Sequence, residues 1–177
     1  MSESQQLQFG AIARYDSSGY KADDSPALEG MAERKGGIWA GARAAWQSDW
    51  LDLHADWTHD ISGNSNGQEI SVGAERSWQI SNSITLTPRI SAVWSDSKAL
   101  NYYYGVRDDE VSSDRAAWQG GSGVTVEVGM QGVYEFTRHQ SLMIDFKAAH
   151  LPSAVSDSPL VNRSDENRLF IGYLYHF

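Results

Sequence analysis

The sequence predicts an all-β protein: an antiparallel, up-and-down transmembrane β-barrel with about eight strands in this chain. Three observations carry this prediction. Apolar and polar residues alternate with period 2 in eight segments, as they do in strands that face lipid on one side. The connections between these segments are alternately short and long. Aromatic residues gather near both ends of the segments, as in the girdles of membrane barrels.

The first four segments each carry apolar residues at every second position. The third is the clearest, because Leu53 and Trp57 alternate with His54 and Asp56. In the fourth, Arg76 interrupts the apolar face. Each segment has about the length that a tilted membrane strand requires. The four segments cover residues 7–15, 38–46, 51–58 and 69–78.

The last four segments continue the alternation and end on an aromatic residue. In the final one, Leu169, Ile171, Tyr173, Tyr175 and Phe177 share one face. A terminal strand with an apolar outer face, closed by an interfacial aromatic residue, is typical of bacterial outer-membrane barrels. These four segments cover residues 84–94, 124–136, 142–148 and 169–177.

The connections predict the orientation of the barrel. Those at residues 47–49, 81–83 and 137–141 are short, and those at 16–37, 59–67, 95–123 and 150–167 are long. Outer-membrane barrels have short periplasmic turns and long external loops, so an even strand number places both ends of the barrel on the periplasmic side. Aromatic residues beside short turns and long loops predict two girdles, although strand ends in other β-proteins also carry aromatics. They are Trp46, Trp50, Trp78, Phe136 and Phe177 on one side and Tyr15, Trp57 and Trp94 on the other.

Composition agrees with one membrane domain over residues 1–177. The chain has no cysteine, and its net charge of -9 argues against a nucleic-acid partner. Its mean hydropathy of -0.47 fits a barrel, in which half of each strand faces lipid. The first residues lack the basic and apolar regions of a signal peptide. We therefore expect the chain to be a mature form or to lack its natural start.

Charged residues of both signs occupy the polar face of the strands. A narrow eight-stranded barrel leaves no room for a conducting pore, so the sequence predicts a plug of salt bridges in the interior. An acid–base cluster of Asp52, His54 and Asp56 is the alternative, but the pleat alone explains its spacing and no nucleophile accompanies it. The predicted interior residues are Arg14, Arg43, Arg89, Lys147, Asp52, His54, Asp56, Glu69, Glu75, Glu127, Glu135 and Asp145.

Acidic clusters lie in two of the long loops, Asp23-Asp24 and Asp108-Asp109-Glu110. Such clusters bind divalent cations or bridge to lipopolysaccharide in some proteins, but a solvated loop explains them more simply. Their spacing does not match a known calcium-binding loop.

His59, Asp60 and Ser62 form the one candidate for a lipid-active enzyme, but a Ser/Asn/Gly turn explains them more simply. We expect no catalytic, cofactor-binding or metal residues, no cofactor, and no enzymatic activity. A soluble lipocalin-like barrel remains as an alternative fold, with the apolar face inside.

Three segments resemble the MltA-interacting protein (MipA/OmpV) family. They are residues 20–31 (YKADDSPALEGM), residues 102–106 (YYYGV) and residues 157–161 (DSPLV) ahead of the final strand. The loop that contains Asp60, Gly63 and Gly67 fits more loosely. The resemblance extends from about Tyr20 to Phe177.

The resemblance implies a Gram-negative outer-membrane barrel in contact with lipid and lipopolysaccharide. For some members it implies a scaffold that links a murein hydrolase to a murein synthase. A surface-loop receptor for a ligand or ion is the alternative function. Family members have additional amino-terminal strand sequence, so this chain is expected to be a carboxy-terminal portion. Three arrangements of its edge strands are then open. The edge strands pair with each other in a smaller barrel, pair with those of a second molecule, or pair with strands that are missing from this sequence.

Overall fold

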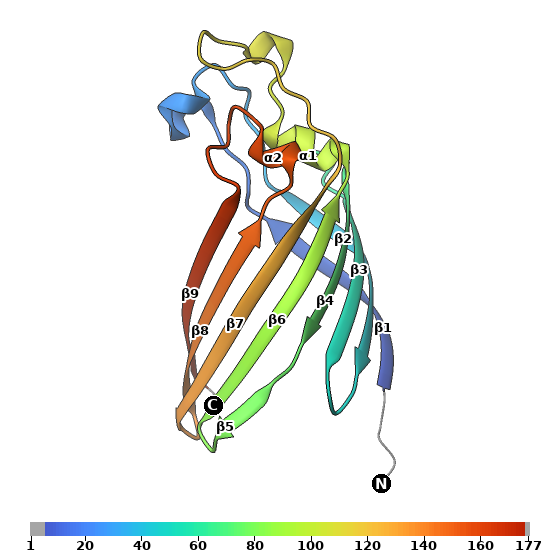
Figure 1. Cartoon of the computed structure of the whole chain (residues 1–177), viewed down its shortest axis with the longest axis vertical. Helices are drawn as coiled ribbons and strands as arrows, with labels where there is room; N and C mark the ends of the chain where they lie inside the picture. Colours follow the sequence, from blue (N-terminus) through green and yellow to red (C-terminus); the bar gives the residue numbers. More distant parts are fainter. Residues whose placement is uncertain (1–5, 176–177) are drawn as a thin grey trace.

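Nine antiparallel strands form one strongly curved sheet in the computed structural model, which describes residues 6–175 (Figure 1). Hydrogen-bonded neighbours follow the order β1-β2-β3-β4-β6-β7-β8-β9, and β5 pairs with β6. The strands are β1 (Gln6–Asp16), β2 (Gly37–Gln47), β3 (Asp52–Asp60), β4 (Gln68–Glu75), β5 (Trp78–Ser81), β6 (Ile84–Ser95), β7 (Gly123–Thr137), β8 (Gln140–His150) and β9 (Asp165–Tyr175).

The predicted up-and-down order and all eight predicted segments are confirmed, and the fourth segment is divided into β4 and β5. Its interruption lies at Arg76 and Ser77, opposite Pro88 on β6. Proline lacks a backbone N–H and is found in sheets where a ladder is irregular. The Arg76 N–H still donates to the Pro88 carbonyl, at 3.2 Å.

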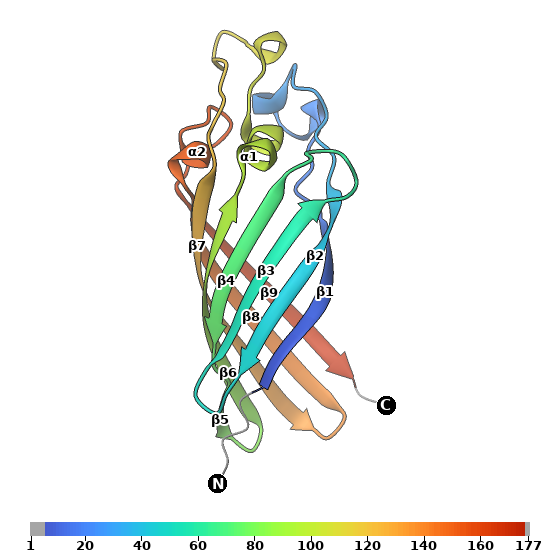
Figure 2. The ribbon, with the colours of Figure 1, turned by 90° about the vertical axis from the view of Figure 1, so that its right-hand side faces the viewer.

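Short turns and long loops lie at opposite ends of the sheet, as predicted (Figure 2). The long-loop end carries α1 (Ser97–Tyr104), α2 (Ser153–Ser156) and three 3-10 turns: η1 (Ala22–Asp24), η2 (Pro26–Leu28) and η3 (Asp108–Glu110). The short-turn end holds the start of β1 and the end of β9. Phe177, the predicted closing aromatic residue, lies outside the described residues.

The outward face of the sheet is apolar and exposed. Phe9, Val72 and Val128 are 78%, 50% and 49% exposed, although a soluble protein would bury them. Among the described residues, the buried apolar side chains instead lie mainly in or beside the long loops, and include Met31, Leu100, Val106 and Val155. The apolar face is therefore outside, and the alternative of a soluble lipocalin-like barrel is wrong.

The sheet does not close in the part of the chain that the structure describes. β1 and β9 form the two edges, and no ladder joins them. Figure 1 shows them on opposite sides of the curved wall. Among residues 6–175, no helix is long and apolar enough to cross a membrane.

Candidate functional site

The concave face of the sheet, here called the lumen, is crossed by ion pairs between neighbouring or facing strands. Each of the four basic residues predicted to lie inside pairs with one of the predicted carboxylates, which confirms the salt-bridged interior. The nitrogen–oxygen distances are 2.6–2.7 Å in the last three pairs. The pairs are Arg14 with Glu69, Arg43 with Asp56, Arg89 with Asp145 and Lys147 with Glu127.

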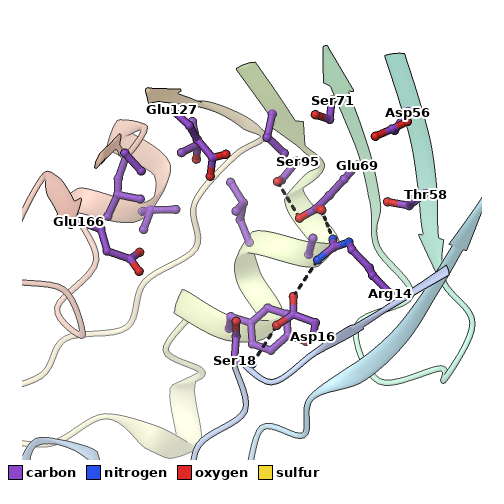
Figure 3. A pocket seen from close by; sticks show the side chains of 18 of the residues that line it. Arg14, Asp16, Ser18, Asp56, Thr58, Glu69, Ser71, Ser95, Glu127 and Glu166 are labelled. Carbon is purple, nitrogen blue, oxygen red and sulfur yellow. Dashed lines mark hydrogen bonds and ion pairs between the residues drawn. The ribbon is translucent and has the colours of Figure 1, made fainter. Parts of the chain in front are cut away.

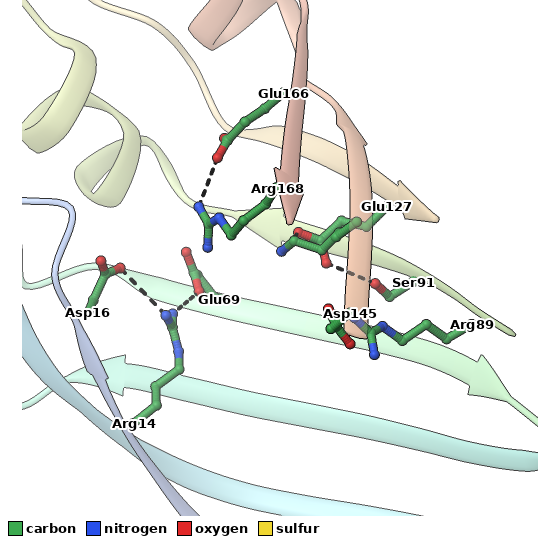
Figure 4. A network of polar contacts seen from close by, with 10 residues as sticks. Arg14, Asp16, Glu69, Arg89, Ser91, Glu127, Asp145, Glu166 and Arg168 are labelled. Atoms are coloured by element: carbon green, nitrogen blue, oxygen red, sulfur yellow. Dashed lines mark hydrogen bonds and ion pairs between the residues drawn. The ribbon is translucent and has the colours of Figure 1, made fainter. Parts of the chain in front are cut away.

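Arg14 connects opposite parts of the wall (Figures 3 and 4). From β1 it pairs with Glu69 on β4, 55 residues away in the sequence, and lies 3.5 Å from Asp16. Ser95 donates its hydroxyl to the second Glu69 oxygen at 3.1 Å. The guanidinium also lies 4.9 Å from the ring centre of Trp39, which is fully buried. Arg14 therefore has a fixed position near the long-loop end of the lumen.

A cavity of about 390 Å³ lies between this network and the long loops. Leu100, Tyr103 and Tyr104 of α1 and Val155 of α2 line it, together with the charged lumenal side chains. Glu166, which pairs with Arg168 at 2.8 Å, faces the same space from β9 (Figure 4). A cavity of this size, with aromatic and paired charged groups, has the dimensions and chemistry to hold a small polar molecule.

The long loops form a cap that Arg34 and Glu110 hold together. We define the cap as residues 17–36, 96–122 and 151–164. The Arg34 and Glu110 side chains are 1% and 2% exposed, and their charged groups meet at 2.7 Å. Arg34 also donates to the carbonyl of Tyr102 at 2.7 Å, and its guanidinium carbon lies 5.9 Å from the ring centres of both Tyr20 and Tyr102. A buried ion pair whose remaining groups are satisfied fixes a geometry that solvent would otherwise loosen.

The surroundings of Glu110 favour the ionised form of its carboxyl group. Burial by itself would raise the pKa of this carboxyl, but hydrogen bonds from the Arg107 backbone, the Arg34 guanidinium and the Ala32 backbone outweigh burial, so the pKa is lowered. Folding of the cap around Glu110 is therefore favoured at pH values above the ordinary glutamate range.

Arg115 makes a second cross-link within the cap. Its guanidinium donates to the carbonyls of Ala27 at 2.7 Å and Glu29 at 2.8 Å in the first loop, and to that of Glu110 at 2.8 Å. The side chain is nearly buried, so these three carbonyls replace water as its partners. The loops at residues 17–36 and 96–122 are thereby joined at two points, the Arg34–Glu110 ion pair and the Arg115 guanidinium.

The three sequence segments that resemble the family meet in this cap. Tyr20 and Tyr102 flank Arg34, and Val106 is 1% exposed. Ser158, from the third segment, donates its hydroxyl to the Tyr104 carbonyl at 2.6 Å. The segments therefore share a structural task, which is to hold three loops together above the lumen.

The acidic loop clusters separate into exposed and buried members. Asp108 and Asp109 are exposed, as are Asp23 and Asp24, but Glu110 is buried with Arg34. No group of three or more metal-ligating side chains occurs among the residues that the structure describes. The solvated-loop interpretation fits the exposed aspartates and is wrong for Glu110.

Asp52, His54 and Asp56 point into the lumen at alternate positions of β3 but do not form a hydrogen-bonded cluster among the described residues. Both Asp56 oxygens accept hydrogen bonds from Arg43, at 2.6 Å. The His54 ring packs against Gly73 on β4, where a side chain would collide with it. The pleat explains their spacing, as the simpler interpretation predicts.

His59, Asp60 and Ser62 do not meet as a catalytic triad. Ser62 donates its hydroxyl to Asp60 at 2.5 Å, and no hydrogen bond joins it to His59 within the described chain. The other Asp60 oxygen accepts from the backbone N–H groups of Ser65 and Asn66, at 2.6 and 3.1 Å. Asp60 therefore stabilises the β3–β4 loop, which is the role that a polar turn predicts.

Sequence reasoning missed the structural roles of Arg34 and Arg115. Both lie in loops, where no periodicity marks a residue as buried, and their partners are distant in sequence: Glu110 is 76 residues from Arg34. Glu166 and Arg168 were also missed, because the predicted last segment begins at Leu169, whereas β9 begins at Asp165.

Comparison with known proteins places the chain in a family. A family model described as MltA-interacting protein MipA matches residues 1–177. The chain is 25% identical over 164 residues to the MltA-interacting protein of Escherichia coli K12, a match covering 89% of this chain and 64% of that protein. It is 24% identical over 158 residues to the outer membrane protein Omp26La of Vibrio anguillarum and 23% identical over 158 residues to OmpV of Vibrio cholerae. Each of those matches covers 89% of this chain and 61% of the relative.

The chain thus spans less than two thirds of the length of these relatives. The match over its whole length confirms the resemblance of the three loop segments, and the names of the relatives place them in the outer membrane of Gram-negative bacteria. The protein belongs to the MltA-interacting protein MipA family of outer-membrane proteins.

Proposed function

We propose that this protein is a structural scaffold in the outer membrane that holds a murein hydrolase at its periplasmic end, and through it a murein synthase. The observation that carries the proposal is the salt-bridged lumen under a fixed cap, with four basic side chains paired to carboxylates. Such an interior joins neighbouring and facing strands into a rigid frame. The E. coli relative is named for an interaction with MltA, which supports a partner of that kind.

The short turns supply the surface that faces the periplasm in this proposal. The turns after β5 and β7 are exposed, and Arg138 lies at the tip of the second. A basic tip suits an acidic patch on a soluble partner. The apolar belt contacts membrane lipid, and the exposed cap faces lipopolysaccharide on the other side.

Capture of a purified lytic murein hydrolase by the detergent-solubilised protein tests this scaffold. We expect the wild type to retain the hydrolase and Arg138→Glu to retain it several-fold less, because the substitution reverses the charge at the turn. Asp109→Arg, a charge reversal on the exposed cap, is the matched control and leaves retention unchanged. Failure of the wild type to retain the hydrolase, or equal loss in both variants, contradicts the proposal.

A ligand-binding role is a second candidate, favoured by the 390 Å³ cavity below the cap. Its lining combines Tyr103 and Tyr104 with Glu166 and Arg168, a set that suits a small zwitterion such as an amino acid. In a panel of amino acids, one that binds should then raise the temperature at which the protein unfolds. Unfolding is followed by the heat-dependent change in its mobility on a denaturing gel. No change with any member of the panel contradicts this candidate.

We also propose that further strands complete the wall between β9 and β1. Both edges are unpaired among the described residues, and unpaired backbone groups in lipid are costly, at several kcal/mol each. Phe170 lies on the lumenal face, opposite Asp145, yet is 54% exposed. The relatives have additional length in which such strands can lie.

Paired cysteines test whether β1 and β9 meet directly. Ala11→Cys with Ile171→Cys should not form a disulfide in membranes, since the bridge needs Cα atoms within about 7 Å. Ala11→Cys with Ala42→Cys, which are register partners on β1 and β2, should cross-link efficiently. The natural chain has no cysteine to interfere. A cross-link between positions 11 and 171 would show direct closure or pairing between molecules, against the proposal.

A further inference from the structure

We propose that a notch in the wall near the short-turn end binds an anionic phospholipid of the periplasmic leaflet. The notch lies where β3 and β5 diverge. The β3–β4 ladder ends at the pair Asp52 and Glu75, and β5 pairs only with β6 among the described strands. Residues 77–81 therefore have no backbone partner on the β3 side within residues 6–175. Figure 1 shows β5 directed away from the β2–β3 hairpin.

The notch has the volume and lining for an acyl chain. It is an open hollow of about 570 Å³, and its wall combines aromatic and aliphatic side chains with the charged side chains of Glu75, Arg76 and Arg89. Trp50, Trp78 and Ile90 are 77%, 50% and 53% exposed, so the apolar wall is open to whatever surrounds the barrel. Besides these three, Leu51, Ala74 and Pro88 line the apolar part.

The depth of the notch in the membrane identifies what surrounds it. Trp50 and Trp78 belong to the aromatic residues beside the short turns, which in an outer-membrane protein mark the periplasmic boundary of the hydrocarbon layer. Ala74 and Ile90 are register partners on the outward face, deeper in the same layer. The notch therefore extends from the periplasmic headgroup level into the lipid.

Arg76 supplies charge complementarity to a phosphate. It shares the outward parity of Val72 and Ala74, so a basic side chain occupies a position where the neighbouring side chains are apolar. One guanidinium nitrogen donates to the Asp49 carbonyl, and no carboxylate of the described residues lies within 4.0 Å of Arg76. Arginine forms charge-assisted hydrogen bonds with phosphate oxygens. An amphiphile with an anionic head and acyl tails fits this combination, because its tails cover the apolar part of the wall while its phosphate meets Arg76.

Native mass spectrometry of the intact protein tests the site, with phosphatidylglycerol and phosphatidylcholine as probes. We expect the wild type to retain phosphatidylglycerol with roughly fivefold preference, the effect of one basic side chain at an anionic lipid surface. Arg76→Gln should abolish that preference while lipid is still retained through its tails. Trp78→Ala should reduce retention of both lipids. Heat-dependent gel mobility shows that each variant is folded.

Arg163→Gln, which removes a basic side chain from the cap at the opposite end, is the matched control and should keep the wild-type preference. Equal retention of the two lipids by the wild type, or an unchanged preference in Arg76→Gln, overturns the proposal. Loss of murein hydrolase capture in Trp78→Ala with unchanged lipid retention would also overturn it, and would assign the notch to a protein partner. The lipid result does not depend on the proposed scaffold role.

Discussion

Val128→Arg is expected to destabilise the protein by about 2–4 kcal/mol, the cost of a basic side chain on the lipid face near the membrane midplane. Val128 lies in the middle of the sheet, between Ile90 on β6 and Ala148 on β8, and its side chain is exposed on the outward face. Arginine at this position faces hydrocarbon with no carboxylate partner on the same face of these neighbours. Urea-dependent unfolding from phospholipid vesicles, followed by tryptophan fluorescence, measures the change.

Thr125→Arg is the matched control on the same strand. Thr125 lines the lumenal cavity, as Glu127 does, so a basic side chain there finds water and carboxylates. We expect little loss of stability, and a smaller loss than for Val128→Arg in any case. Equal destabilisation by the two variants would show that the assignment of the two faces is wrong.

Glu110→Ala is expected to open the cap, with a loss of about 3–5 kcal/mol in its local stability. The substitution leaves the Arg34 charge buried without a partner and removes the acceptor for the backbone N–H groups of Ala32 and Arg107. The strands keep their ladders, so the effect is confined to the long loops. Hydrogen exchange of the cap amides, together with protease cleavage within residues 17–36 and 96–122, measures it.

Two comparisons make this result specific to the ion pair. The double variant Arg34→Met with Glu110→Leu removes both charges and should recover part of the lost protection. In the wild type, the lowered pKa of Glu110 keeps the contribution intact above the ordinary glutamate range, and it disappears as pH falls through the lowered pKa. Both pH 8 and pH 6 lie above the pKa of free glutamate, roughly 4.3. A loss of hydrogen-exchange protection of the cap amides between these two pH values would contradict this role for Glu110.

The strands and turns could be read from the sequence because their causes are local. The alternation of Leu53 and Trp57 with His54 and Asp56 predicts β3 over residues 51–58, and the structure places the strand at Asp52–Asp60 with the predicted faces. Ion pairs in the lumen were predictable as a class, since charges of both signs share a narrow interior. Which carboxylate pairs with Arg14 was not predictable, because Glu69 reaches it across the sheet.

The cap and the notch depend on contacts between distant residues. Glu110 looks like one more acidic loop residue in the sequence, and only the fold brings Arg34 to it. The interruption of the apolar face at Arg76 is visible in the sequence, but the notch also needs Trp50 from another hairpin and Pro88 from a third.

The sequence by itself determined the fold class, the order of the strands, the inverted placement of apolar residues and the family. These follow from periodicity and from short segments, each of which acts within a few residues. The tertiary structure decided which charges pair, that the long loops form a cap, and that β1 and β9 stay unpaired in the described chain. The physical reason is that alternation directs each side chain to one face, whereas the curvature and register of the sheet determine which side chains meet there.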